Sequence, residues 1–164
     1  MRVLGIDPGL ATMGFGVIES LNGRLVLIRC GVITTSPDLY MPDRLMLINR
    51  GVEDLLFAYK PDDIAFEELF FARNVTTALT VGAARGVALC ACAQYSSSLY
   101  EYTPMQIKQA VVGYGKAEKS QVQNMVRLLL GLADIPKPDD AADAVAVAIT
   151  HANAGRSKGQ FLIK

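Results

Sequence analysis

The 164-residue sequence predicts an α/β domain in which helices flank a mixed sheet of five strands. Three short extended segments come first and are separated by turn sequences, which is typical of an antiparallel meander. Longer segments with helical spacing then alternate with two further short apolar runs, which is typical of parallel strands joined by crossover helices. The length is most simply one domain, and 51% apolar and 20% charged residues are ordinary for a globular protein.

The first three predicted strands form the meander. Residues 2–7 are expected to be a buried strand, and Pro8-Gly9 turns the chain into a second strand over residues 13–19. Asn22-Gly23 is a strong hairpin signal, so residues 24–35 are expected to return beside the second strand. An antiparallel unit is therefore predicted on one side of the sheet.

Helical spacing begins after the meander. Leu45, Ile48, Val52, Leu55 and Tyr59 recur at steps of three and four residues, and a Pro-Asp pair ends this helix. The elements expected after it are a strand over residues 63–67, a helix over 74–95, a strand over 99–103, helices over 104–112 and 119–130, and a last helix that follows Pro138 with Asp139 as its N-cap.

The helix expected over residues 74–95 is apolar and contains Gly82 and Gly86 four residues apart. Two roles are open for these glycines: close packing of helices within the monomer, or a contact between subunits. No apolar run approaches the ~18 residues of a membrane span, and Asp7 interrupts the N-terminus too early for a signal peptide. We therefore expect a cytoplasmic protein without a membrane segment.

Three cysteines and one histidine are the residues that would suggest a soft-metal site. Cys30, Cys90 and Cys92 are odd in number, which argues against a disulfide framework. Cys90 and Cys92 fall on different helix faces, which argues against zinc, so reduced core thiols are expected. His151 lies about 12 Å along the last helix from Asp143, and we expect it near the helix C-terminus rather than at a metal.

Positive charge is concentrated in two segments although the net charge is zero. Residues 104–130 contain four cations and one acid, and residues 156–164 contain three cations and no acid. The zero net charge argues against nonspecific nucleic-acid binding through bulk charge, whereas local basic faces can still bind phosphates. A plain solvated surface is the alternative for the lysines of the first segment.

Four carboxylates occupy positions where a charge is costly. Asp7 and Glu67 each end an apolar run, and Asp140 and Asp143 lie in the otherwise apolar segment 139–149. A buried carboxylate needs a partner, a proton or a metal ion. No Lys or Arg lies within three residues of Asp7, Glu67 or Asp143 in the sequence. Carboxylate oxygens gathered at one point favour magnesium (Mg2+).

The predicted topology brings these acids together. The first and fourth strands are joined through a helix, so a right-handed crossover can place Asp7 and Glu67 at the same sheet edge. Asp140 and Asp143 are spaced i,i+3 and share a helix face. Two carboxylates about 4 Å apart repel by roughly 4 kcal/mol at an effective dielectric of about 20. Four of them would therefore need cations, and two divalent ions about 3.5–4 Å apart would fit.

Three of the four acids also have an ordinary structural explanation, whereas Asp143 is harder to dismiss because its neighbours are Ala and Val. Asp7 before a Pro-Gly pair can open a turn, Glu67 and Glu68 can be exposed charges at a strand end, and Asp140 can favour the helix dipole. Spacing alone does not choose between Glu67 and Glu68, or between Asp139 and Asp140. The case for a metal site therefore depends on all the acids together.

Five short motifs stand out along the chain. They are Gly5-Ile6-Asp7-Pro8-Gly9, Ala65-Phe66-Glu67-Glu68-Leu69-Phe70, Gln109-Ala110-Val111-Val112-Gly113, Ala117-Glu118-Lys119-Ser120-Gln121-Val122 and Asp140-Ala141-Ala142-Asp143-Ala144. Together and in this order they resemble the RuvC family of Holliday junction resolvases. The resemblance runs from residue 2 to about residue 152, nearly the whole chain.

This resemblance implies a ribonuclease H-like fold, a homodimer, and magnesium-dependent cutting of two opposed strands at a four-way DNA junction during recombination and repair. It implies that Asp7, Glu67, Asp140 and Asp143 are the catalytic metal ligands, which selects between the neighbouring acids left open above. It also implies two Mg2+ ions per subunit, with Mn2+ as a substitute. A branch-migration helicase complex of the RuvA and RuvB type is the implied protein partner.

The DNA contacts implied by the resemblance are one aromatic residue and several cations. Phe70 matches the aromatic position near the junction centre, although core packing is the alternative for it. Lys108 and Lys119 match basic positions that face DNA. Arg73 and Lys116 complete the expected DNA-binding set.

Two other functions compete with the nuclease. ATPases and phosphotransferases of the actin, sugar-kinase and Hsp70 type also begin with a strand, an Asp-containing loop and a second strand, and Gly14 and Gly16 fit that pattern. That class needs two domains, whereas we expect one nuclease domain over residues 1–155 followed by a basic tail over residues 156–164. The other alternative is a non-catalytic binder of DNA structure, but acids that face phosphate would not help binding.

Overall fold

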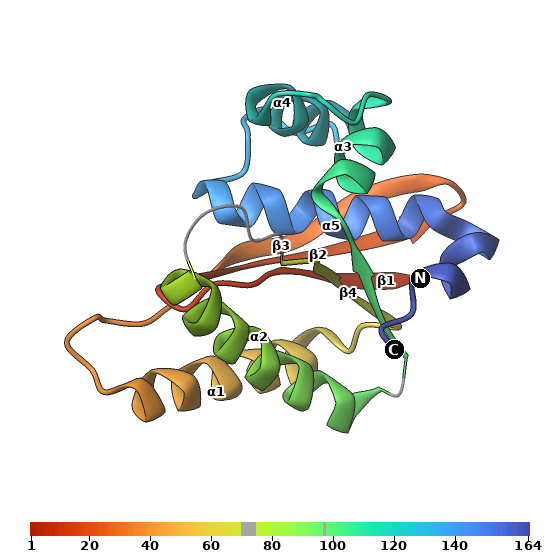
Figure 1. Ribbon diagram of the computed structural model, residues 1–164. Coiled ribbons are helices and arrows are strands. Elements are labelled where there is room, and N and C mark those ends of the chain that lie inside the picture. The colour runs from red at the N-terminus through yellow and green to blue at the C-terminus, as the bar shows by residue number, and fades with distance from the viewer. Residues whose placement is uncertain (70–74, 97) are drawn as a thin grey trace.

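A computed structural model describes residues 1–69, 75–96 and 98–164 of the chain (Figure 1). The elements are β1 (Arg2–Asp7), β2 (Thr12–Leu21), β3 (Arg24–Thr34), α1 (Met41–Tyr59), β4 (Asp63–Glu67), α2 (Val75–Tyr95), β5 (Leu99–Tyr102), α3 (Pro104–Val112), α4 (Lys119–Leu129), α5 (Asp139–Ala154) and the 3₁₀ helix η1 (Gly155–Phe161). The predicted α/β class and element order are confirmed.

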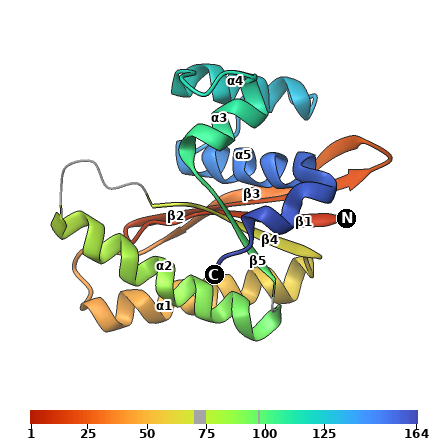
Figure 2. The same ribbon diagram turned by 45° about the vertical axis from the view of Figure 1, so that its right-hand side comes forward.

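The helices form layers on the two faces of the sheet. Helices α1 and α2 cover one face, α5 covers the other, and α3 and α4 lie outside α5 (Figures 1 and 2). An apolar core fills the space between the sheet and the helices on each face. As a result, β1 and β4 are buried on both sides. Near-continuous apolar strands of this kind are typical of a sheet that is covered by helices on both faces.

The sheet has the strand order β3-β2-β1-β4-β5 and is mixed. Strands β1, β2 and β3 are antiparallel neighbours, and both Asn22 and Gly23 in the hairpin turn have positive φ, as a type I′ turn requires. Strand β4 pairs in parallel with β1, and strand β5 pairs in parallel with β4. The β2 strand is longer than predicted at both ends, since its pairing with β3 continues through Thr12 and Leu21.

Two glycines allow α5 to lie directly on the sheet. A Cβ atom at Gly5 of β1 would collide with the backbone oxygen of Ala144, and one at Gly14 of β2 would collide with the backbone oxygen of Asp140. Any side chain at these positions would therefore push the helix away from the strands. Because Gly14 is paired with Asp7 in the sheet, this close approach places the first turn of α5 at the end of β1.

The start of α5 differs from the expected cap. Pro138 is the N-cap residue and Asp139 is already the first helical residue, without a side-chain capping hydrogen bond, so the prediction of Asp139 as N-cap is wrong. The Asp139 carboxylate instead lies 3.1 Å from the Lys137 ammonium and 3.9 Å from that of Lys119. The exposed Asp139 side chain therefore pairs with these two lysines and does not cap the helix.

Helices α3 and α4 begin with well-defined caps. The Thr103 side chain accepts a hydrogen bond from the backbone N–H of Gln106, and the Gln106 side chain accepts one from the Thr103 backbone. Gly113, with φ of 83°, ends α3. Glu118 and Gln121 form the corresponding capping box of α4, which fixes Lys119 at the first position of that helix.

Residues 155–164 pack against the rest of the chain. The Lys158 ammonium lies 2.6 Å from the Asp63 carboxylate, and the Phe161 ring lies 4.6 Å from the Tyr102 ring between centroids. Leu162 forms an isolated bridge with Tyr100 of β5. The segment expected as a basic tail thus contributes contacts to the edge of the sheet.

Helix α2 leaves much of its apolar surface uncovered. Among the described residues, a Cβ atom at Gly82 or Gly86 would meet nothing within 4 Å, so the idea that these glycines permit close packing against the described part of the monomer is wrong. By length and composition alone, residues 77–95 could cross a membrane, and only 22% of that segment is buried. Cys90 is exposed for the same reason, which corrects the expectation that all the thiols are core residues.

Candidate active site

The four predicted carboxylates approach one another at the edge of the sheet. Asp7 ends β1 and Glu67 ends β4, and the parallel register pairs the residues just before them, Ile6 and Phe66. The first turn of α5 adds Asp140 and Asp143, which lie above the same edge. Three elements that are distant in sequence therefore bring their acids to one region of the structure.

Burial and mutual repulsion change the acidity of this cluster. Burial and, to a smaller extent, the nearby carboxylates of Glu67, Asp143 and Asp140 together raise the pKa of Asp7 to about 8. Burial, assisted by the Asp143 charge, raises the pKa of Glu67 to about 7. In the absence of added cations, the cluster thus retains protons that ordinary carboxyl groups lose well below neutral pH.

Lys119 is the principal cation at the cluster. Its ammonium lies 2.7 Å from Oδ2 of Asp143 and donates a hydrogen bond to it. Burial raises the pKa of Asp143, while this contact opposes the increase. The same contact raises the pKa of Lys119. Lys119 therefore supplies part of the positive charge that the carboxylates need.

A small cavity of about 240 Å³ adjoins the cluster. Lys108 lies in its wall and lowers the pKa of Glu67, so a second of the cations expected to face DNA lies near the acids. The residues that line the cavity are Glu67, Pro104, Ile107, Lys108, Lys119, Val122, Asp143 and Ala146. Lys116 is not among them and instead lines a larger cavity on the other side of α3.

The donor set fits a hard divalent cation in its chemistry. All the ligand atoms are carboxylate oxygens, which Mg2+ and Mn2+ prefer. In the part of the chain that the structure describes, no three Asp, Glu, His or Cys side chains converge closely enough to hold one ion as they stand. Asp143 is instead turned to Lys119. Metal binding therefore requires side-chain rearrangement within the cluster.

Two of the predicted DNA contacts fall outside the described residues. Phe70 and Arg73 both belong to the segment 70–74 between β4 and α2. Their roles remain predictions.

His151 is fully buried far from the carboxylate edge, as expected. Its Nδ1 lies 2.9 Å from the Tyr102 hydroxyl, and its Nε2 lies 3.1 Å from Oδ2 of Asp63. Burial lowers the pKa of His151, and hydrogen bonds from Lys158 and His151 keep the pKa of Asp63 low despite its burial. No local pattern in the chain indicates this network, because its members lie on four separate elements.

A family model described as the crossover junction endodeoxyribonuclease RuvC matches residues 3–151. The chain belongs to the RuvC family. A RuvC of Chloroflexus aurantiacus is 57% identical over 152 residues, which cover 93% of both chains. A RuvC of Alkaliphilus oremlandii is 51% identical over the full length of both chains.

Solved structures agree with this assignment. The structure of T. thermophilus RuvC in complex with Holliday junction substrate matches with a TM-score of 0.93 and 39% identity, over 99% of each chain. The yeast mitochondrial Holliday junction resolvase Ydc2 matches with a TM-score of 0.68 and 14% identity, over 92% of this chain and 77% of its own, which supports the fold alone.

Membership of the RuvC family establishes the general activity. The fold is ribonuclease H-like, and the chain is a Holliday junction resolvase, a nuclease of DNA recombination and repair that uses divalent metal. The alternatives of a nucleotide-dependent phosphotransferase and of a non-catalytic DNA binder are therefore wrong. The predicted family and enzyme class are confirmed.

Proposed function

We propose that Asp7, Glu67, Asp140 and Asp143 bind two Mg2+ ions in each subunit and that this centre hydrolyses a phosphodiester bond at a four-way junction. The observation that carries the proposal is the mutual electrostatic coupling of acids from β1, β4 and α5. Carboxylates that raise one another's pKa in this way favour an added cation strongly. Bound ions of this kind supply an activated water and stabilise the leaving oxygen, and Mn2+ can substitute for Mg2+.

In this proposal, the lysines beside the carboxylates bind DNA phosphates. Lys108 and Lys119 lie beside the carboxylates, and their ammonium groups can bind the phosphates on either side of the cleaved bond. We also expect Lys116, Phe70 and Arg73 to contact DNA, with Phe70 and Arg73 outside the described residues. Residues 1–155 then form the nuclease domain, and the cations of residues 156–164 lie outside its catalytic centre.

We propose a homodimer, because one carboxylate cluster per chain cannot make two opposed cuts at once. A two-fold dimer supplies two identical sites through one isologous interface. The uncovered face of α2 supports this assembly: Leu79 is 70% exposed, and Gly82 and Gly86 are open to close approach by another helix. Burial of this face against a second copy would also account for its membrane-like composition.

The cellular setting follows from the same activity. We propose that the enzyme works in the cytoplasm on junctions moved by a branch-migration helicase complex of the RuvA and RuvB type. The T. thermophilus relative was solved with a Holliday junction substrate, which supports junction DNA as the substrate here.

Cleavage of a synthetic four-way junction tests the proposed function. Strand cutting should require Mg2+ or Mn2+ and should stop when EDTA is added. Linear duplex of the same sequence should be cut far more slowly. Cutting of the junction without a divalent ion would overturn the proposed metal centre.

A further inference from the structure

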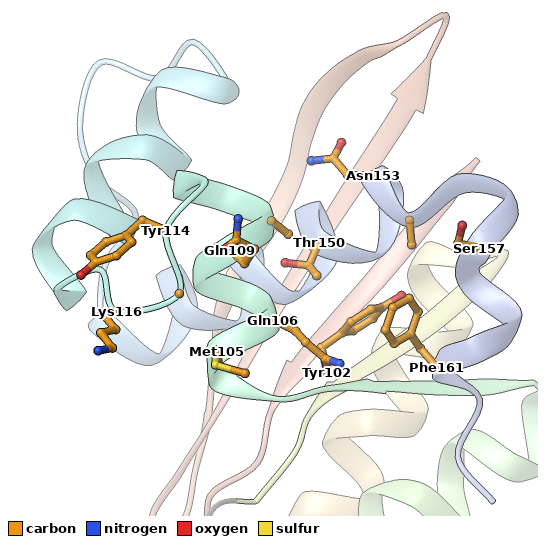
Figure 3. Close-up of a pocket in the computed structure, with 13 residues that line it drawn as sticks. Tyr102, Met105, Gln106, Gln109, Tyr114, Lys116, Thr150, Asn153, Ser157 and Phe161 are labelled. Atoms are coloured by element: carbon orange, nitrogen blue, oxygen red, sulfur yellow. The ribbon is translucent and has the colours of Figure 1, made fainter.

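A second cavity is separate from the carboxylate cluster. Its volume is about 720 Å³, it lies between α3 and η1 (Figure 3), and it shares no lining residue with the cavity beside Glu67 and Lys108. We call it the α3–η1 groove. The residues that line it are Tyr102, Met105, Gln106, Gln109, Ala110, Tyr114, Gly115, Lys116, Thr150, Asn153, Ala154, Ser157 and Phe161.

The groove has an apolar floor and apolar lips. The rings of Tyr102 and Phe161 lie against each other between α3 and η1 (Figure 3). Met105 and Tyr114 are 66% and 57% exposed, which is costly for side chains of this size. Exposed Met and Tyr around an apolar depression are typical of protein interaction sites.

Four of the eight polar side chains that line the groove are already hydrogen-bonded to other groups of the chain. Gln106 Oε1 accepts the Thr103 backbone N–H, and Gln109 Nε2 donates to the Gly113 carbonyl. The Thr150 hydroxyl donates to the carbonyl four residues earlier, and the Tyr102 hydroxyl bonds to His151. The anchoring part of the groove, between the Tyr102 and Phe161 rings and the Met105 side chain, is apolar, so it favours a ligand that is apolar where it anchors.

The charge at the two ends of the groove is positive. Lys116 lines one end, and Arg156 immediately precedes Ser157 at the other. Among the described residues neither cation is in an ion pair, and the lining contains no Asp or Glu. A ligand that carries carboxylates on both sides of an apolar anchor would complement this arrangement.

From these features we propose that the α3–η1 groove binds an acidic peptide segment of a partner protein, with a large apolar side chain seated between α3 and η1. This interaction goes beyond junction cleavage. The part of the groove on α5, at Thr150 and Asn153, lies about 15 Å along the helix from Asp140 and Asp143, at 1.5 Å of rise for each of ten residues. A docked partner would therefore leave the carboxylate cluster accessible to DNA.

The test uses the full chain in EDTA and phage-displayed random peptides as the probe. Peptides that combine Asp or Glu with a large apolar residue should be enriched. Synthetic copies of them should shift the amide resonances of Ala110 and Gly115 in NMR spectra. Raising the salt concentration should weaken the binding. Absence of any enriched peptide, or peptides without acids, would overturn the proposal.

Two substitutions locate the binding. Ala154→Trp fills the groove and Met105→Ala removes one lip, and each should weaken peptide binding about tenfold or more, as loss of an apolar anchor contact does. Leu128→Ala is the matched control, because Leu128 is 58% exposed on α4 and does not line the groove. Equal peptide affinity in all the variants would place the site elsewhere and contradict the proposal. Thermal unfolding shows whether Ala154→Trp folds, and Met105→Ala alone decides the question if it does not.

The alternative that the α3–η1 groove binds single-stranded DNA instead of a peptide is tested with a short oligothymidylate. If Met105→Ala and Ala154→Trp weaken oligothymidylate binding while no peptide binds, the groove belongs to DNA and the proposal is overturned. Both variants should cut a four-way junction at the wild-type rate in Mg2+. Failure of the wild-type chain to cut would count against the proposed function alone, because peptide binding is measured without metal.

Discussion

The ammonium of Lys119 lies 2.7 Å from Oδ2 of Asp143, so a lysine from α4 neutralises an acid from α5 beside the other carboxylates. A divalent ion and this ammonium compete for the same negative charge. In the proposed metal centre, an ion on Asp143 weakens this contact, and a released Lys119 ammonium is then free for a DNA phosphate. The contact thus links metal binding to the availability of a DNA-binding cation.

Lys119→Met should raise the affinity for Mg2+ by about fivefold when it is measured above pH 8, where Asp7 is ionised. The reason is that the metal no longer breaks a charge-assisted hydrogen bond, which contributes about 1 kcal/mol for a partly exposed pair. Titration calorimetry on the free enzyme measures this directly. Lys116→Met is the control, because Lys116 lines the other cavity and is not among the groups that shift the pKa of Asp7 or Glu67. A weaker Mg2+ affinity in Lys119→Met would contradict the competition.

Asp7→Asn and Glu67→Gln should each abolish junction cutting. Each substitution keeps the shape of the side chain but removes a charged ligand from the proposed metal centre. Junction binding, measured by gel shift in Ca2+, should change little because the basic residues are intact. Parallel loss of binding and cutting would argue against a purely catalytic role for these acids.

The stability of the metal-free enzyme should depend on pH through Asp7 and Glu67. Their raised pKa values, about 8 and about 7, mean that the native state binds more protons than the unfolded state between about pH 5 and about pH 7. These groups therefore contribute stability at low pH that is lost as the pH rises, by up to about 1.4 kcal/mol per pH unit for each proton. Urea unfolding in EDTA should show a smaller loss in Asp7→Asn than in wild type. An identical pH dependence of the two proteins would show that Asp7 has an ordinary pKa.

Lys108→Ala and Lys116→Ala should each weaken junction binding. Each should also reduce, by about one, the slope of the logarithm of the binding constant against the logarithm of the salt concentration. The physical reason is that each lost phosphate contact leaves one more counterion on the DNA. Arg50→Ala is the control, because Arg50 is exposed on α1 on the other face of the sheet. A slope that is unchanged in Lys116→Ala would assign that residue to the solvated surface or to the α3–η1 groove alone.

Leu79→Arg should convert the proposed dimer into monomers, because a charge would replace an apolar residue in the interface. Sedimentation shows the state of assembly, and Leu128→Arg, a similarly exposed position on α4, should leave the dimer intact. Mixing wild-type and Asp7→Asn chains should give junctions that are nicked on one strand. Paired cuts by a monomer would contradict the proposed assembly.

Much of the fold could be predicted from local sequence. The Asn22-Gly23 turn specifies a hairpin because both residues tolerate positive φ. The spacing of Ile48, Val52 and Leu55 specifies a helix with one buried face. These features depend on residues that are close together in the chain. The start of α5 was predicted incorrectly because nearby lysines, and not only the helix end, compete for the Asp139 carboxylate.

The uncovered surface of α2 and the α3–η1 groove could not be predicted in this way. The apolar composition of α2 is equally compatible with a core helix, and only its position outside the sheet leaves Gly82, Gly86 and Cys90 without cover. The groove depends on how η1 folds back beside α3, which brings Phe161 to Tyr102.

The sequence by itself determined the element order, the family and the four acids, because strand ends, glycine positions and helical spacing are local properties. Only the tertiary structure decided that Lys119 forms an ion pair with Asp143 and that Asp63 contacts both His151 and Lys158. These ion pairs join residues that are between 24 and 95 positions apart. Their geometry is set by the packing of α4, α5 and η1 around the sheet, since no local pattern encodes which distant charges a fold brings together.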